Sequence, residues 1–158
     1  MSDIERESLL EFLQRQRDLV AWKLQDAGDE TLRAVGTGSG LTPHGVVRHL
    51  TNVERSWFRW VLADQPDLAF DYTDEDPDLD FKPPADLLMT QLLADYAAEQ
   101  KRCDEVILAA DSLDDMGVNR ERTLRWILLH MIEETARHLG QLDILREQAD
   151  GSTGDRPD

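Results

Sequence analysis

The sequence predicts an all-α protein, a four-helix bundle with a long acidic loop between its second and third helices. Four long segments carry apolar residues at helical spacing, and almost nothing alternates as a strand would. The chain of 158 residues is also long enough to bury one core. We assign residues 1–150 to this single domain and residues 151–158 to a flexible polar tail.

The first two helices are indicated by apolar spacing and by local start and stop signals. We expect the first helix over residues 3–27, and Gly28 follows it as a plausible stop. Its apolar positions include Leu9, Leu13, Val20 and Leu24. Near the end of the glycine-rich stretch RAVGTGSGLTPHG, the hydroxyl of Thr42 and the ring of Pro43 make a start signal. The second helix should continue from there to about Ala63.

The third and fourth helices are expected over residues 85–110 and 123–149. Before the third helix lies DQPDLAFDYTDEDPDLDFKPP, a long acidic segment interrupted by prolines. Its aspartates could suggest a calcium site, but their spacing lacks the glycine and the terminal glutamate of an EF-hand loop. We therefore expect this segment to be a solvated lid.

Composition and charge exclude several classes of partner. With 33 acidic and 17 basic residues, the net charge of −16 should repel nucleic-acid phosphates and anionic lipids. We therefore expect neither nucleic acid nor a membrane as a partner. Cys103 is the only cysteine, which excludes an internal disulfide and a cysteine-rich zinc site. No signal peptide or membrane-spanning run is apparent, so we expect a cytoplasmic location.

Helical phase draws attention to the stretch HMIEETARHLGQLDILRE in the fourth helix. At roughly 100° per residue, His138 falls within the inward apolar stripe, Glu134 at its edge and His130 toward the polar face. On the second helix, His49 lies at the margin of the stripe, whereas His44 in the first turn is expected at the surface. A metal site between facing helices and a hydrogen-bonded group of core polar residues both remain open at this point.

Two stretches, LTPHGVVRHLTNVERSWF and HMIEETARHLGQLDILRE, together resemble the DinB/YfiT-like superfamily of small four-helix metalloproteins. The chain is most similar to the actinobacterial, mycothiol-transferase-like branch of these DinB-related proteins, and the similarity includes the segment DLDFKP. The superfamily typically binds its metal through one histidine on helix two and an H-x-x-x-H pair on the last helix. The resemblance places His49 and His138 on two of these positions. Glu134 stands where the first histidine of the pair is usual.

The resemblance therefore implies a metal site of His49, Glu134 and His138. His130 would be either a fourth ligand or a residue that contacts the ligands without binding the metal. Zinc accepts this donor set and leaves a position open; iron, nickel or manganese would also suit it. The implied function is a metal-dependent S-transferase that brings a low-molecular-weight thiol such as mycothiol to a small electrophilic substrate. No catalytic residue beyond the ligands is expected, and Cys103 is not needed as a nucleophile.

Two other functions stay open. A metal-assisted hydrolase would use the metal to activate water instead of a thiol. A non-catalytic bundle that binds a small molecule or a partner protein is favoured by the departure at Glu134. It is also favoured by Trp126, which projects from the polar side of the fourth helix, where an exposed tryptophan often marks an interface. We expect a homodimer.

Overall fold

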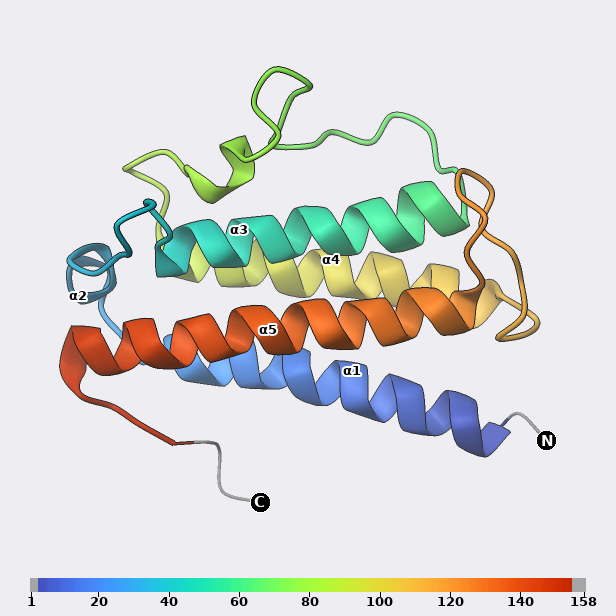
Figure 1. Ribbon diagram of the computed structural model, residues 1–158, viewed down its shortest axis with the longest axis horizontal. Helices are drawn as coiled ribbons and strands as arrows, with labels where there is room; N and C mark the ends of the chain where they lie inside the picture. The colour runs from blue at the N-terminus through green and yellow to red at the C-terminus, as the bar shows by residue number, and fades with distance from the viewer. Residues whose placement is uncertain (1–2, 155–158) are drawn as a thin grey trace.

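The computed structural model describes residues 3–154 and is a bundle of four long helices, which confirms the predicted all-α fold (Figure 1). The long helices are α1 (Asp3–Leu24), α3 (Pro43–Glu54), α4 (Met89–Ala109) and α5 (Leu124–Asp150). The helix α3 continues directly into the π-helix η1 (Arg55–Leu62). The chain also has two short helical elements, the helix α2 (Asp29–Arg33) and the 3-10 turn η2 (Leu79–Phe81). Residues 155–158 of the predicted tail lie outside the described part of the chain.

The ends of α3 and α5 follow the capping chemistry that the sequence indicates. The Thr42 hydroxyl oxygen accepts the backbone N–H of Gly45 at 3.1 Å, and Thr123 accepts that of Trp126 at 3.2 Å. At the other end of α5, Gly151 has a left-handed φ of 78°, which glycine adopts without a side-chain clash. These local signals explain why both helices begin within a residue of the predicted positions.

The helix α4 begins four residues later than predicted, at Met89 instead of Ala85. Its first backbone N–H, that of Met89, is accepted at 2.8 Å by Oδ1 of Asp29 in α2. A carboxylate from another element thus satisfies one of the free donors at the helix start. The sequence around residues 85–89 contains no sign of this distant partner.

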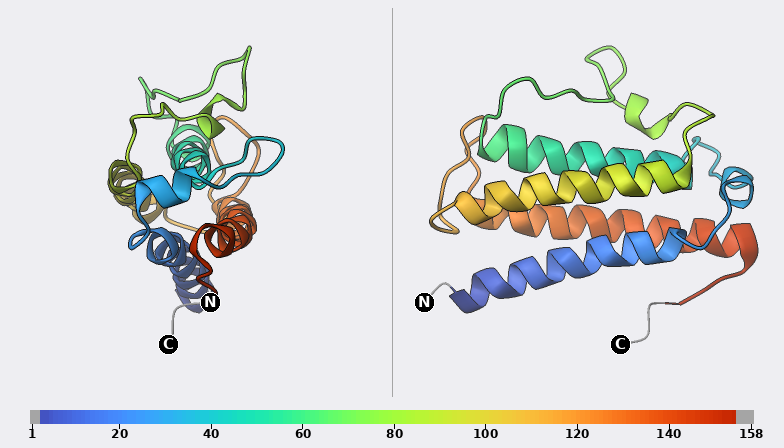
Figure 2. Two further views of the ribbon diagram at one scale, coloured as in Figure 1. Left: turned by 90° about the vertical axis from the view of Figure 1, so that its left-hand side faces the viewer. Right: turned by 180° about the vertical axis from the view of Figure 1, so that it is seen from behind.

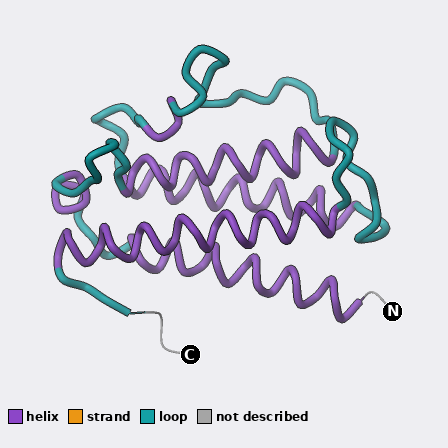
Figure 3. The backbone as a smooth tube through the Cα atoms, viewed as in Figure 1, coloured by secondary structure: helices purple, strands orange, loops and turns teal. Residues whose placement is uncertain are grey.

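Helix directions explain the long acidic loop. Figures 1 and 2 show that α3 and α4 run side by side in the same direction. The chain leaving η1 must therefore return along the bundle before α4 can begin, and residues 63–88 make this crossover (Figure 3). Most of these residues are exposed or half-buried, as expected for a solvated loop, but the prediction of a lid is wrong near the end of the segment, where Asp80 is only 2% exposed. There Arg48 of α3 donates to the carbonyl of Leu79 at 3.1 Å and holds the loop on the helix.

The apolar core forms two layers separated by a buried polar level. One layer includes Leu13, Phe58, Val61, Ile107, Leu124 and Met131; the other includes Val20, Leu24, Val46, Leu50, Met89 and Leu142. Between them Arg17 Nη2 and Glu54 Oε2 form an ion pair of 2.6 Å, and both side chains are almost completely buried. Glu134 falls near this level on α5, so polar chemistry is concentrated at the middle of the bundle.

Candidate metal centre

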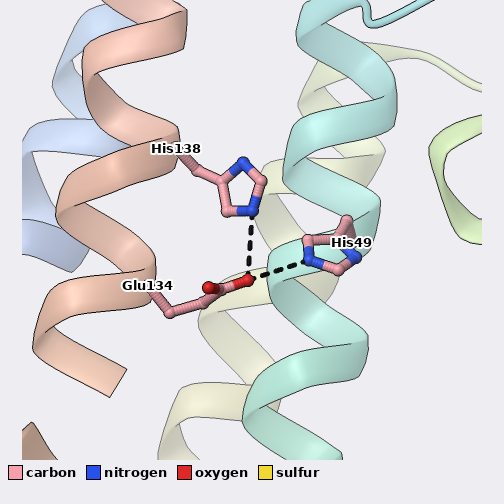
Figure 4. A group of neighbouring side chains, drawn as sticks. All are labelled: His49, Glu134 and His138. Atoms are coloured by element: carbon pink, nitrogen blue, oxygen red, sulfur yellow. Dashed lines mark hydrogen bonds and ion pairs between the residues drawn. The ribbon is translucent and has the colours of Figure 1, made fainter. Parts of the chain in front are cut away.

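His49 of α3 meets Glu134 and His138 of α5 at the seam between the two helices (Figure 4). Nε2 of His49 lies 3.2 Å from Oε1 of Glu134, and Nε2 of His138 lies 3.1 Å from the same oxygen. The three ligand atoms lie within 4.8 Å of one another, which is close enough for one ion to bind them. The side chains are 17%, 21% and 9% exposed, so the group can be reached from solvent.

The outer nitrogens of both histidine rings are held by oxygen acceptors. His49 Nδ1–H donates to Oδ2 of Asp80 at 2.9 Å, and His138 Nδ1–H donates to Oε1 of Gln141 at 2.7 Å. An oxygen acceptor keeps a proton on Nδ1, so Nε2 of the neutral ring carries a lone pair. Both lone pairs then point toward Glu134, the arrangement that metal-binding histidines usually have.

The donor set fits a cation. Two imidazole lone pairs and a carboxylate oxygen repel one another unless a positive charge lies among them or the rings are protonated. Burial disfavours the charged form of His49, but hydrogen bonds to Asp80 and Glu134 outweigh it and raise the pKa of His49. Hydrogen bonds to His138 and His49 hold the pKa of Glu134 well below its ordinary value. The group therefore favours positive charge, as protons or as a metal.

The turn η2 fixes Asp80 against α3. Phe81 stacks on the ring of His49, with a centroid separation of 4.0 Å and an interplanar angle of 19°. This close approach requires Gly45, since a Cβ there would lie 2.2 Å from the carbonyl oxygen of Phe81. Packing of the loop on α3 thus sets the position of the carboxylate that orients His49.

Two other histidines differ from the candidate ligands in their surroundings. His130 lies outside the group of three; its ring stacks on Trp126 at 5.0 Å and meets Trp57 at 4.6 Å. His44 was expected at the surface, and that prediction is wrong, because the residue is only 2% exposed. Its Nε2 lies 2.8 Å from Oδ1 of Asp29, so a partner in α2 accounts for its buried position.

Sequence reasoning does not identify Asp80 or Gln141 as part of the site. Gln141 follows His138 by three residues, so helical spacing alone could have indicated their contact. Asp80 lies in the segment DLDFKP, one acidic residue among many, and only the path of the loop brings it to His49. Its second oxygen, Oδ1, is buried and has no hydrogen-bond partner within the described residues.

Comparison with known proteins gives one match. A family model described as Mycothiol-S-transferase matches residues 8–151. No curated protein and no solved structure matches the chain. The matched range includes His49, Glu134 and His138 together with Asp80 and Gln141, so the family comparison and the site geometry concern the same part of the molecule.

Proposed function

Since the chain belongs to the mycothiol-S-transferase family of the DinB/YfiT-like superfamily, we propose that it is a metal-dependent thiol transferase. In the proposed reaction, a low-molecular-weight thiol of the mycothiol type loses its proton and its sulfur bonds to an electrophilic carbon of a small substrate. That carbon releases a leaving group with the bonding electrons. The observation that carries the proposal is the convergence of His49, Glu134 and His138 on one point.

We propose zinc as the metal, held by Nε2 of both histidines and by the carboxylate of Glu134. Two imidazole nitrogens and one carboxylate oxygen form a donor set of catalytic zinc, which leaves a position for a substrate. Iron, nickel and manganese accept the same donors, so metal analysis has to decide among them. When bound, the metal lowers the pKa of a thiol and makes the thiolate available at neutral pH.

The residues of the chain hold and orient the site in this proposal, and none of them supplies the nucleophile. Asp80 and Gln141 keep a proton on the outer nitrogen of each histidine ring, so that Nε2 is free to bind. Cys103 is completely buried. Burial raises the pKa of its thiol and the charge of Glu54 raises it further, so this thiol stays protonated. The reacting sulfur therefore has to come from a bound small molecule.

Location and assembly remain predictions. Among residues 3–154, no helix has both the length and the apolar composition needed to cross a bilayer. We retain the expectation of a cytoplasmic homodimer. Sizing at micromolar protein concentration tests the assembly, and a monomeric profile would contradict it.

The test combines metal analysis with a thiol-conjugation assay on the wild type and on three variants. We expect stoichiometric metal and thiol-dependent product from the wild type, and loss of both in His138→Ala and Glu134→Gln. Glu133→Gln is the matched control, because Glu133 is the exposed neighbour of Glu134 and should retain metal and activity.

Three results would overturn the proposal. Absence of stoichiometric metal after a mild, chelator-free purification would exclude a metal-dependent enzyme. Turnover of the substrate without added thiol would identify a metal-assisted hydrolase instead. Bound metal with no conjugation of any electrophile in a panel would identify a non-catalytic bundle.

A further inference from the structure

Three aromatic rings form a partly exposed cluster beside the candidate metal centre. Trp57 and Trp126 lie 5.2 Å apart between ring centroids, and His130 contacts both, stacking on Trp126 with an interplanar angle of 16°. Trp126 is 39% exposed, and the other two rings are half-buried. We call these three residues the aromatic cluster. Part of the Trp126 side chain is therefore open to solvent, and an aromatic molecule can pack against it.

The aromatic cluster continues the same helix seam that holds the metal centre. His130 and Trp126 precede Glu134 on α5 by one and two helical turns, and Trp57 follows His49 by two turns along α3 and η1. Helical rise places His130 about 6 Å along the axis from Glu134. Because α3 and α5 run antiparallel and side by side (Figure 1), the cluster borders the metal centre on one face. A ligand of modest size can therefore reach both.

Two arginines lie on the tryptophan rings at the end of this seam. The guanidinium carbon of Arg122 is 4.8 Å from the ring centroid of Trp126, and that of Arg120 is 5.3 Å from Trp57 and 5.8 Å from Trp60. Arg122 also donates to the carbonyl of Glu121, its neighbour in sequence, at 2.8 Å. Within residues 3–154 neither guanidinium forms an ion pair with a carboxylate.

The lack of ion pairs is notable in a chain with 33 acidic and 17 basic residues. Elsewhere Arg17, Arg55 and Arg125 each have a carboxylate partner within hydrogen-bond distance. A guanidinium stacked on an aromatic ring keeps its N–H groups free to bind a carboxylate, a sulfonate or a phosphate. Arg120 and Arg122 are therefore placed to recognise an anionic ligand.

The loop between α4 and α5, which carries Arg120 and Arg122, is fixed to η1. The backbone N–H of Asn119 donates to the carbonyl of Val61 at 3.1 Å, and its side-chain amide donates to the carbonyl of Trp60 at 2.8 Å. Gly117 lies so close to this helix end that a Cβ would be 3.0 Å from the Val61 oxygen. The π-helical turns of η1 carry Trp57, and such turns often mark functional sites. The backbone that carries Arg120 and Arg122 is thus held against the helix that carries Trp57.

We propose that the aromatic cluster with Arg120 and Arg122 binds the electrophilic substrate, and that this substrate is a planar aromatic molecule with an anionic group. Its ring system packs against the exposed part of the aromatic cluster, and its anion pairs with the guanidinium groups. Its reactive carbon faces the metal centre one turn along α5. This assignment rests on the proposed transferase function and adds to it the chemical class of the second substrate.

The test measures binding to metal-free, full-length protein by calorimetry, with naphthalene-2-carboxylate as an unreactive probe and naphthalene-2-carboxamide as its neutral match. We expect one molecule of the carboxylate to bind, about tenfold or more tighter than the amide. The double variant R120Q/R122Q should bind the carboxylate only as weakly as the amide. Trp126→Leu should weaken the binding of both probes, because it removes the exposed aromatic surface against which they pack.

The matched control is Trp22→Leu on α1, because a cation also lies over that ring, with Lys23 Nζ 5.3 Å from its centroid. This variant should bind both probes like the wild type. Absence of saturable binding, equal affinity for carboxylate and amide, or an equal loss in Trp22→Leu would overturn the proposal. Thermal melts of every variant identify any that fail to fold. R120Q and R122Q tested singly then replace a double variant that does not fold.

Failure of this proposal can be distinguished from failure of the transferase proposal. Probe binding needs neither metal nor thiol, so it can be absent while metal content and conjugation activity remain normal. Conversely, Glu134→Gln tests the metal centre and leaves the tryptophans and arginines in place. In the metal-loaded enzyme, R120Q/R122Q should raise the KM for an anionic aromatic electrophile without changing the metal content.

Discussion

Oδ2 of Asp80 lies 2.9 Å from Nδ1 of His49, so a residue of the crossover loop orients a candidate ligand of the bundle. The carboxylate is 2% exposed, which keeps water from competing for this hydrogen bond. A carboxylate on the outer nitrogen fixes the ring and makes Nε2 a stronger base. The loop between η1 and α4 is thus part of the candidate site as well as a connection.

We expect Asp80→Asn to weaken zinc binding about 10- to 100-fold, because the amide keeps the shape of the side chain but removes its charge. Competition with a chromophoric chelator at neutral pH measures the change. The control is Asp76→Asn, on the same loop, where the carboxylate pairs with Lys82 at the surface, 2.8 Å away. An equal loss of zinc affinity in both variants would contradict a specific role for Asp80.

A second prediction concerns the close approach of η2 to α3. Gly45→Ala would place a methyl group 2.2 Å from the Phe81 carbonyl oxygen, so the turn carrying Asp80 must move. We expect a loss of about 1–3 kcal/mol in the free energy of unfolding, together with weaker zinc binding. Urea denaturation and the chelator competition measure the two effects.

Gly140→Ala provides the opposite control within α5. A Cβ at Gly140 meets nothing within 4 Å, and alanine stabilises a helix relative to glycine. This variant should gain roughly 0.5–1 kcal/mol in the free energy of unfolding and keep its zinc affinity. If the two alanine variants behaved alike, steric contact with Phe81 could not be the cause.

The helices could be predicted from sequence because their signals are local. Apolar spacing and the capping threonines, Thr42 and Thr123, act within a few residues, and the structure has both caps. The meeting of His49 with Glu134 and His138 could also be anticipated, because helical phase and the family resemblance place all three near the bundle interior. The roles of these residues as ligands remain predictions.

The rest depends on contacts between distant parts of the chain. That α3 and α4 run parallel is not visible in the sequence of either helix, so the sequence predicts a lid where the structure has a crossover loop that packs on α3 at Asp80. The same path brings Asp80 to His49, 31 residues apart. His44 is buried because Asp29 comes from another element, which helical phase within α3 could not indicate.

The buried ion pair at the middle of the bundle gives a third prediction. Glu54 and Arg17 are 0% and 2% exposed, so Glu54→Gln leaves a guanidinium charge without its main partner. Asp104 remains 2.8 Å from Arg17, but it is 43% exposed and compensates only in part. We expect a loss of about 3–5 kcal/mol in the free energy of unfolding, measured by urea denaturation.

Two further variants separate a lost charge pair from lost packing. The double variant Arg17→Met/Glu54→Leu removes both charges and should recover much of the stability, since buried ion pairs are often replaceable by apolar residues. Asp76→Asn breaks an exposed pair and should change stability little. A double variant as unstable as Glu54→Gln alone would show that side-chain volume, and not the unpaired charge, is decisive.

The last prediction is that protons and metal compete at His49. Hydrogen bonds to Asp80 and Glu134 overcome the effect of burial and raise the pKa of His49 above its ordinary 6.5, so Nε2 takes up a proton as the pH falls through that raised pKa. Because binding must displace this proton, zinc affinity should fall on acidification by about tenfold per pH unit below the raised pKa. Glu134 stays ionised over this range, since hydrogen bonds to His138 and His49 hold its pKa well below the ordinary value.

Chelator competition from about pH 5 to about pH 8 measures the profile. In Asp80→Asn the decline should begin at lower pH, and an unshifted profile would contradict this account.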